Sequence, residues 1–332
     1  MDQPITEPPP AGSAAQFAPG FGTRSLLTVD TEEEFDWTRP FTRSEHGLTH
    51  VAHIARFQEF CEELGVSPVY LVDWPIASSR AAVEVIGSAV KAGHAEVGIQ
   101  LHPWVNPPFE EDLTAFNSYA GNLPPELERA KFLRLRDRIA DAFGTQPLIY
   151  RAGRYGVGPQ SAELLREAGV PIDSSVRANF DYRAGHGPDY SRHPLAPYWV
   201  DREQDLLELP LTTVYWGMLR RQGRWVRPLL HKMPRITGLF SRVGLLERIA
   251  LTPEGVTAEE ALCGIDMAID DGLPLLVLSF HSPSLAPGHT PYVRSGADLD
   301  RLYDWFRRVY TYLEMRGVAP TNVAEIMRSV QR

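Results

Sequence analysis

The sequence predicts an α/β barrel, in which parallel strands alternate with helices, and three observations support this fold class. Short apolar runs of strand length alternate with stretches of helical periodicity, a pattern typical of parallel βα units. The length of 332 residues suits one large barrel as well as two smaller domains. Polar residues directly follow several of the expected strands, where barrels of this kind carry their functional groups.

The expected elements follow one another along most of the chain. Seven apolar runs are expected to form strands, at 25–30, 68–73, 95–101, 148–152, 172–176, 206–209 and 275–281. Helices are expected at 50–64, 124–143, 161–168, 257–270 and 297–315. Residues 1–23, rich in Pro, Ala and Gly, are expected to form a disordered arm. The barrel then occupies 24–332, with insertions around 177–256.

Composition and charge exclude several classes of protein. The net charge is −9 and no dense basic cluster is present, so nucleic acid is not an expected partner. No apolar stretch approaches the roughly 18 residues of a membrane span, and the first residues do not form a secretory signal. A cytoplasmic location is therefore expected. The two cysteines, Cys61 and Cys263, are expected to be buried free thiols.

An acidic segment follows the first expected strand. Five carboxylates occur within the seven residues 30–36, a density that a cation or an arginine has to balance. Asp30 ends the apolar run, and Glu32 would project to the same side in extended chain. These two are the candidate functional carboxylates, whereas Glu33, Glu34 and Asp36 are expected to form a solvated turn.

Other strand ends carry complementary groups. Gln100 and His102 share one face of the third expected strand, and imidazole is a common ligand of Zn²⁺. Arg151 and Arg154 follow the fourth strand among glycines, an arrangement suited to holding a carboxylate. His281 closes the last strand and is available as a general acid or base. Together these residues place an acid pair, histidines and arginines on one rim.

In this order the motifs resemble those of polysaccharide deacetylases of the NodB-homology type, carbohydrate esterase family four. The sequence looks most similar to the WalW-like branch of that family. Five ordered motifs run from Asp30 to His281, and the resemblance covers residues 24–332. It implies a distorted (β/α)7 barrel of the glycoside hydrolase and deacetylase type.

The resemblance also implies roles for individual residues. Asp30 falls on the position of the general base, Arg151 on that of the residue that orients this base, and His281 on that of the general acid. Asp173, in the fourth motif, is implied to help line the substrate groove. Because Thr31 stands where a second Asp is usual, Glu32 takes the metal-binding role.

The implied metal site departs from the family pattern. The second motif normally supplies two histidines after a Glu–hydrophobic–Gly step, and here those positions hold Gln100 and Trp104. His102 is the one histidine nearby, so the implied ligands are Glu32 and His102, with Gln100 as a weak third. The implied cofactor is a divalent metal, with Zn²⁺ as the first choice.

The expected reaction is hydrolysis of an N-acetyl group on an amino sugar or glycan precursor by metal-activated water, with an Asp base and a His acid. The expected partner is thus a small molecule or oligosaccharide, with Arg154 contacting it and Trp104 and Tyr155 stacking on a sugar ring. Two alternatives stay open. Gln100 favours a metal-independent amide or cyclic amide hydrolase of the same superfamily, and a degenerate barrel that binds glycan without catalysis is the third reading.

Overall fold

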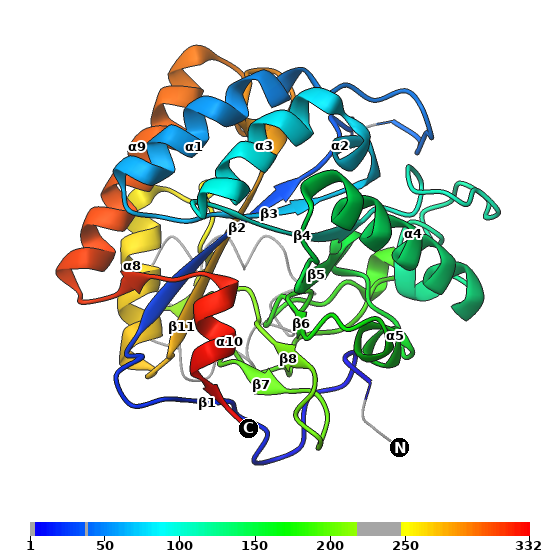
Figure 1. Ribbon diagram of the computed structural model, residues 1–332. Coiled ribbons are helices and arrows are strands. Elements are labelled where there is room, and N and C mark those ends of the chain that lie inside the picture. Colours follow the sequence, from blue (N-terminus) through cyan, green and yellow to red (C-terminus); the bar gives the residue numbers. More distant parts are fainter. Residues whose placement is uncertain (1–3, 37–38, 218–246) are drawn as a thin grey trace.

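A curled sheet of parallel strands forms the centre of the molecule (Figure 1). The structure is a computed structural model that describes residues 4–36, 39–217 and 247–332. Seven strands run parallel in the order β11-β2-β3-β4-β5-β6-β8. Their bounds are β2 Arg24–Thr31, β3 Val69–Val72, β4 Glu96–Leu101, β5 Ile149–Ala152, β6 Ile172–Asp173, β8 Leu207–Glu208 and β11 Leu275–His281. All seven coincide with expected strands, so the predicted distorted (β/α)7 barrel is confirmed.

The barrel closes indirectly between β8 and β11. The chain that leaves β8 brings Thr212 beside β11, where Thr212 N donates to Val277 O at 3.2 Å and Val277 N donates to Thr212 Oγ1 at 2.9 Å. Leu251 bridges the same gap, because its N–H donates to Thr212 O and its carbonyl accepts from Ser279 N. This irregular seam is the distortion of the barrel.

Short strands extend the sheet or pair outside it. Antiparallel pairs join β7 (Tyr198–Trp199) to β8, β9 (Thr213–Trp216) to β10 (Glu247–Ala250), and β1 (Gln16–Phe17) to β13 (Val330–Gln331). Strand β12 (Ala319–Pro320) pairs with β2. Strands β7 to β10 lie in the expected insertion region around 177–256, of which residues 218–246 lie outside the described ranges.

Helices cover the outside of the sheet. They are α1 Ile54–Glu63, α2 Trp74–Ser78, α3 Arg80–Ala92, α4 Pro125–Phe143, α5 Ser161–Glu167, α8 Ala258–Asp270, α9 Gly296–Met315 and α10 Val323–Ser329. Five of these match expected helices, while α2, α3 and α10 were not expected. Figure 1 shows α9, α1, α3 and α2 in a row along one side. Within the described ranges, no helix is long and apolar enough to cross a membrane.

The alternation of side chains along each strand builds the site directly on the core. Leu26, Ile149 and Leu275 belong to one buried apolar cluster near the strand starts. Residues an even number of positions further along a strand project to the same face, so this face continues from Leu26 to Asp30 and from Leu275 to His281 at the strand ends. An apolar layer therefore fills one end of the barrel and a polar layer fills the other.

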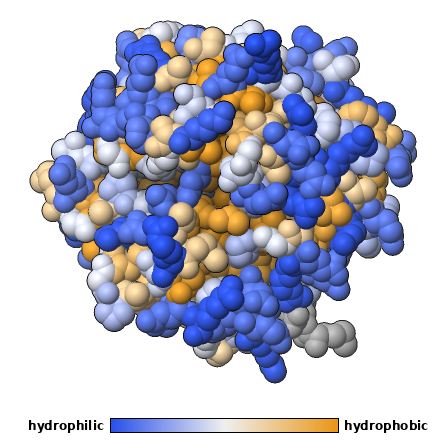
Figure 2. Space-filling model, viewed as in Figure 1, coloured by the Kyte–Doolittle hydropathy of each residue, from blue (hydrophilic) through white to orange (hydrophobic). Residues whose placement is uncertain are grey.

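The face of the molecule in Figure 2 is mostly hydrophilic, with apolar residues gathered around its middle, where the strands lie in Figure 1.

Both cysteines are free thiols, as expected. Cys61 is buried, which confirms the prediction for this residue, whereas Cys263 is only partly buried.

The N-terminal segment is a correction to the sequence prediction. Residues 4–23, expected to belong to a disordered arm, pack against the barrel: Ile5, Ala15 and Phe21 are at most 6% exposed. Ala15 and Phe21 belong to the same apolar cluster as Leu26. The physical reason is that the apolar end of the barrel needs a cover, which outweighs the flexible composition of the segment.

Candidate active site

A cavity of about 220 Å³ opens among the carboxyl ends of the strands. Eight of the ten expected site residues line it: Asp30, Glu32, Gln100, His102, Arg151, Arg154, Tyr155 and His281. Tyr119, Ala152, Arg177 and Tyr182 complete the lining. The structure thus brings together residues that lie up to 251 positions apart in the sequence, from Asp30 to His281 (281 − 30).

Asp30 is held by Arg151 at the floor of the cavity. Arg151 Nη1 donates to Asp30 Oδ1, and both side chains are buried. The rest of the guanidinium is fixed by Ser174, whose carbonyl accepts from Nε at 2.8 Å and whose Oγ accepts from Nη2 at 3.0 Å. A buried, charge-assisted pair of this kind fixes the orientation of the Asp30 carboxylate.

His281 faces the other oxygen of Asp30. Its Nε2 lies 3.7 Å from Asp30 Oδ2, and its Nδ1 lies 2.6 Å from Glu254 Oε2. Burial alone lowers the pKa of His281, but the negative charges of Glu254, Glu32 and Asp30 together raise that pKa to about 10. The imidazole therefore carries a proton at neutral pH, and its Nε2–H points toward the base.

Glu254 is a functional candidate that the sequence reasoning missed. It accepts from the His281 backbone N–H at 3.2 Å and from Ser284 Oγ at 2.6 Å, in addition to its contact with the imidazole. Burial raises the pKa of Glu254, but His281 and these hydrogen bonds together lower it below the ordinary value. Glu254 follows β10 in the insertion region, and no local pattern in the sequence connects it with His281.

Glu32, His102 and Gln100 form a second group on the cavity wall. His102 Nε2 lies 3.4 Å from Glu32 Oε2, close to the separation of two ligands bound to one tetrahedral ion at about 2.0–2.2 Å. Gln100 Nε2 lies 2.6 Å from Glu32 Oε2, while the buried Oε1 of this amide has no hydrogen-bond partner. Turning the amide over, which exchanges two nearly equivalent atoms, would place an oxygen donor beside the other two.

The charge of Glu32 also favours a cation at this position. Burial raises the pKa of Glu32 to about 8, although His281 and His102 partly oppose this effect. An ionised Glu32 is therefore costly unless a positive charge lies beside it. The donor set of one carboxylate, one imidazole and one amide fits a divalent ion, although the amide is a weaker donor to Zn²⁺ than a histidine would be.

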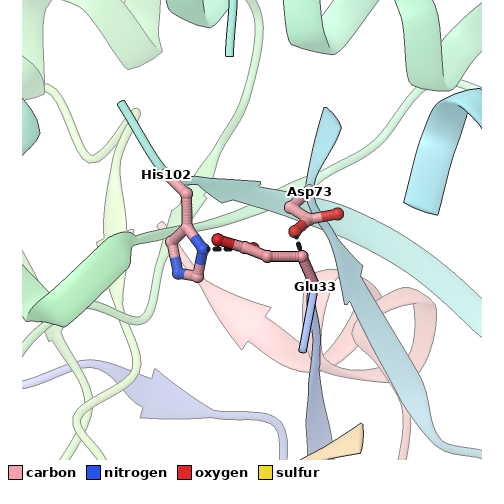
Figure 3. A group of neighbouring side chains, drawn as sticks. All are labelled: Glu33, Asp73 and His102. Carbon is pink, nitrogen blue, oxygen red and sulfur yellow. Dashed lines mark hydrogen bonds and ion pairs between the residues drawn. The ribbon is translucent and has the colours of Figure 1, made fainter. Parts of the chain in front are cut away.

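Glu33 and Asp73 lie behind His102 (Figure 3). Glu33 Oε2 lies 2.8 Å from His102 Nδ1, and Asp73 Oδ2 accepts from the Glu33 backbone N–H at 2.8 Å. All three residues are buried and offer donor atoms within 4.8 Å of one another, so they are a second group of potential metal ligands. Because Glu33 and Asp73 do not line the cavity, their clearest role is to orient His102 with Nε2 toward Glu32.

The prediction that Glu33, Glu34 and Asp36 form a solvated turn is wrong for two of these three residues. Glu33 is fully buried, and burial raises its pKa although its hydrogen bonds with Asp73 and Trp104 act in the opposite direction. The Glu34 side chain is 8% exposed and accepts from Thr49 Oγ1 and from His50. The extended pattern ends at Thr31, where β2 ends, so the alternation used to place these side chains no longer applies. Asp36 is exposed, as expected.

Two expected substrate contacts are also corrected. Trp104 is 1% exposed; its Nε1 donates to Glu33 Oε1 at 2.6 Å and its ring stacks on His102 at 4.3 Å. Asp173 is fully buried and accepts from Ser175 Oγ at 2.6 Å. Neither residue lines the cavity, because these hydrogen bonds hold both side chains in the protein interior. Both residues therefore support the site from behind.

The rim after β5 has an unusual backbone. Arg154 and Tyr155 are consecutive residues with positive φ, 56° and 61°, in a region that non-glycine residues rarely adopt. Gly153 precedes them, and a Cβ there would lie 2.4 Å from His102 Cδ2. The absence of a side chain at Gly153 thus lets this rim approach His102, and the turn directs Arg154 and Tyr155 into the cavity.

Comparison with known proteins supports the fold. No protein-family model and no curated protein matches the chain. A protein from Mycobacterium smegmatis described as a polysaccharide deacetylase has a similar structure, with a TM-score of 0.50, 18% identity, and coverage of 96% of this chain and 98% of its own. Puue allantoinase has a TM-score of 0.53 at 14% identity, with 93% and 91% covered. A family 4 acetyl xylan esterase from Clostridium thermocellum has a TM-score of 0.44 at 13% identity, with 92% and 91% covered. At these identities, the likeness to the first two structures shows a shared fold.

Proposed function

We propose that the protein is a hydrolase of the polysaccharide deacetylase type, which removes an N-acetyl group from an amino sugar or glycan precursor. The observation that carries this proposal is the convergence of Asp30, Arg151 and His281 in one cavity at the strand ends. Asp30 Oδ2 and His281 Nε2 lie 3.7 Å apart there, so a candidate base and a candidate acid face the same reaction centre, and cleavage of an amide by water uses both. The similar fold of the Mycobacterium smegmatis protein described as a polysaccharide deacetylase supports this proposal. Membership of the WalW-like branch and action in the cytoplasm are parts of the same proposal.

The position of each residue in the cavity indicates its role in the proposed reaction. Asp30, held in place by Arg151, takes a proton from the attacking water. His281, held protonated by Glu254, gives a proton to the departing amine nitrogen, which cannot leave as an anion. Such an acid and base each contribute roughly 10²–10⁴-fold in rate. Tyr155 and Tyr119 offer ring surface to a sugar.

A divalent metal belongs to this proposal. Glu32, His102 and Gln100 would hold it, with Glu33 orienting His102 from behind. A bound metal of this kind activates water and polarises a carbonyl group. The specific choice of Zn²⁺ is an expectation that metal analysis decides.

Metal content and acetate release test the proposal together. We expect about one equivalent of a divalent ion per chain by mass spectrometry, with a large loss in both Glu32→Ala and His102→Ala. Acetate release from N-acetylglucosamine oligosaccharides is expected to fall at least 100-fold in His281→Gln. His94→Gln, an exposed histidine whose side chain is 54% exposed, is the matched control and is expected to keep full activity.

The second candidate is a metal-independent hydrolase of cyclic or open amides. Gln100 at the expected histidine position favours it, and the fold that the chain shares with Puue allantoinase is compatible with it. This candidate predicts that activity survives chelation of metal and requires Asp30 and His281 but not Glu32. Retention of the amide-hydrolysing activity after dialysis against EDTA would decide in its favour.

A further inference from the structure

One wall of the cavity carries a guanidinium that the proposed reaction does not use. Arg177 lines the cavity beside Tyr155 and Tyr182. Within the described part of the chain, its polar contact is a single long hydrogen bond, from Nη1 to the Tyr182 hydroxyl at 3.3 Å. A guanidinium has five N–H donors. Most donors of Arg177 are therefore open to a ligand, and no described carboxylate forms an ion pair with this cation.

Aromatic contacts hold Arg177 in place without neutralising it. Its guanidinium carbon lies 4.0 Å from the centroid of the Phe180 ring and 5.3 Å from that of Tyr155. Arg248 lies 3.4 Å from the same Phe180 centroid, so two cations share one ring. Stacking fixes the plane of the guanidinium, and a fixed guanidinium loses less freedom when it binds a planar anion.

The surroundings of Arg177 favour an anionic ligand over a neutral one. A neutral ligand that covered Arg177 would remove water from its open donors and return no countercharge, which disfavours binding. A carboxylate or phosphate would pair with the same donors in bidentate geometry. The acidic groups Asp30 and Glu32 already have partners, which are Arg151 for the first and Gln100 with His102 for the second. The charge of Glu254 also acts on Arg177, but Glu254 pairs with His281 at 2.6 Å and forms no ion pair with this guanidinium.

We infer that Arg177 is an anion-binding, specificity-determining residue, and that the substrate carries a carboxylate or phosphate on the unit whose amide is cleaved. A cavity of about 220 Å³ holds little more than one sugar ring, so the anion and the amide belong to the same small unit. The inference rests on the proposed amide hydrolysis for the nature of the substrate, while the binding of an anion at Arg177 is a separate property.

Binding to three probes tests the inference: N-acetylglucosamine, its 6-phosphate, and the corresponding 6-carboxylate, N-acetylglucosaminuronic acid. Isothermal titration calorimetry of the wild type is expected to give at least about tenfold tighter binding of one or both anionic probes than of the neutral sugar. The two anions distinguish phosphate from carboxylate. Arg177→Gln is expected to abolish the preference, and Arg177→Lys to keep part of it because it keeps the charge.

Arg183→Gln is the matched control. This arginine lies in the same segment, is 68% exposed, and pairs with Asp181 and Asp189 outside the cavity. It is expected to bind all three probes like the wild type. Thermal unfolding of each variant separates a loss of binding from a loss of structure.

Equal binding of charged and neutral probes to the wild type, or an unchanged preference in a folded Arg177→Gln variant, would overturn the inference, as would no binding of either anion. These outcomes differ from failure of the proposed function. Anion binding without acetate release would support the role of Arg177 and refute the proposed hydrolysis. Acetate release from neutral sugars at the same rate in the wild type and in Arg177→Gln would support the hydrolysis and refute the role of Arg177.

Discussion

At the scale of single residues, the catalytic candidates depend on partners that lie behind them. Glu254 holds His281, Arg151 holds Asp30, and Glu33 holds His102. The side chain of each supporting residue is buried, and it fixes which atom of its partner faces the cavity. The chemistry of the cavity is therefore set as much by the layer behind it as by the residues that line it.

The contact between Glu254 and His281 predicts a pH effect. Because Glu254 helps raise the pKa of His281 to about 10, the wild type keeps this acid protonated until the pH approaches that value. Glu254→Gln is expected to move the alkaline limb of the kcat/KM profile down by about 1 pH unit or more. NMR titration of the His281 ring should show the same decrease.

Glu259→Gln provides the control for that change. Glu259 is an exposed carboxylate that pairs with Arg308 on the surface. Its loss is expected to leave both the rate profile and the His281 titration unchanged. A Glu254→Gln profile that coincides with the wild-type profile would show that His281 is not the acid that limits the rate.

Site residues at the strand ends could be predicted from the sequence, whereas the residues that support them from behind could not. Asp30, Arg151 and His281 could be predicted because each closes an apolar run, and parallel strands bring such positions to one rim. Glu254 could not, because its pairing with His281 arises only when β10 packs beside the barrel. Glu33 could not either, since its burial depends on where β2 stops being extended.

At the scale of secondary structure elements, the loop after β4 is held by one buried lysine of α4. Lys131 Nζ donates to the carbonyls of Pro103, Asn106 and Pro108 at 3.0, 2.6 and 2.6 Å, and pairs with Glu111 at 3.0 Å. This loop carries Trp104, which supports His102. A side chain of helix α4 therefore helps to position His102, a candidate metal ligand, through the loop that it holds.

Lys131→Met is expected to lower the free energy of unfolding by about 3–5 kcal/mol, because it leaves the Glu111 carboxylate buried without its cation. Urea unfolding measures this loss. Lys91→Met, on the exposed surface of α3, is expected to change stability by less than about 0.5 kcal/mol. Similar values for the two variants would contradict the role given to Lys131.

The junction of α4 and α5 predicts a pH-dependent stability. Glu128 accepts from Ser161 Oγ and Gln160 Nε2, yet burial raises its pKa to about 7 despite these bonds. Between about pH 4.5 and 7 the unfolded chain loses this proton while the folded chain keeps it, so stability falls as the pH rises through that range. The full effect is about 3 kcal/mol.

Glu128→Gln cannot ionise and should therefore lose less stability than the wild type between pH 5 and pH 8. Calorimetric Tm values at the two pH values measure the difference. Glu126→Gln, an exposed carboxylate in the first turn of the same helix, should behave like the wild type. An equal pH response in all three proteins would show that Glu128 does not carry the effect.

Elements were predictable where periodicity and caps agreed. All seven strands were found, because each buried run is bounded by turn residues. Helix α3 was missed although Ser79 caps its start and Gly93, with φ of 76°, ends it. The short helices α2 and α10, of five and seven residues, contain too few turns to show a period.

At the scale of the whole molecule, the N-terminal segment acts as part of the barrel. Ile5 is 1% exposed, and its carbonyl lies 3.0 Å from His193 Nε2. Ile5→Ala is expected to lower the free energy of unfolding by about 2–4 kcal/mol, measured by urea unfolding, with no effect on the cavity. Pro10→Ala, at an exposed position of the same segment, should have little effect. Equal losses would show that the segment does not fold with the barrel.

The position of β2 in the sheet has a consequence for synthesis of the chain. Strand β2 pairs with β3 on one side and with β11 on the other, and the contact from Thr28 to Leu278 spans 250 residues. At roughly 5–20 residues per second, a ribosome needs roughly 12–50 s to make that interval. Throughout this time one edge of β2 has no partner strand, and an unpaired edge can pair with other chains. The newly made chain is therefore most exposed to aggregation before its last strand emerges, and slower translation lengthens that period.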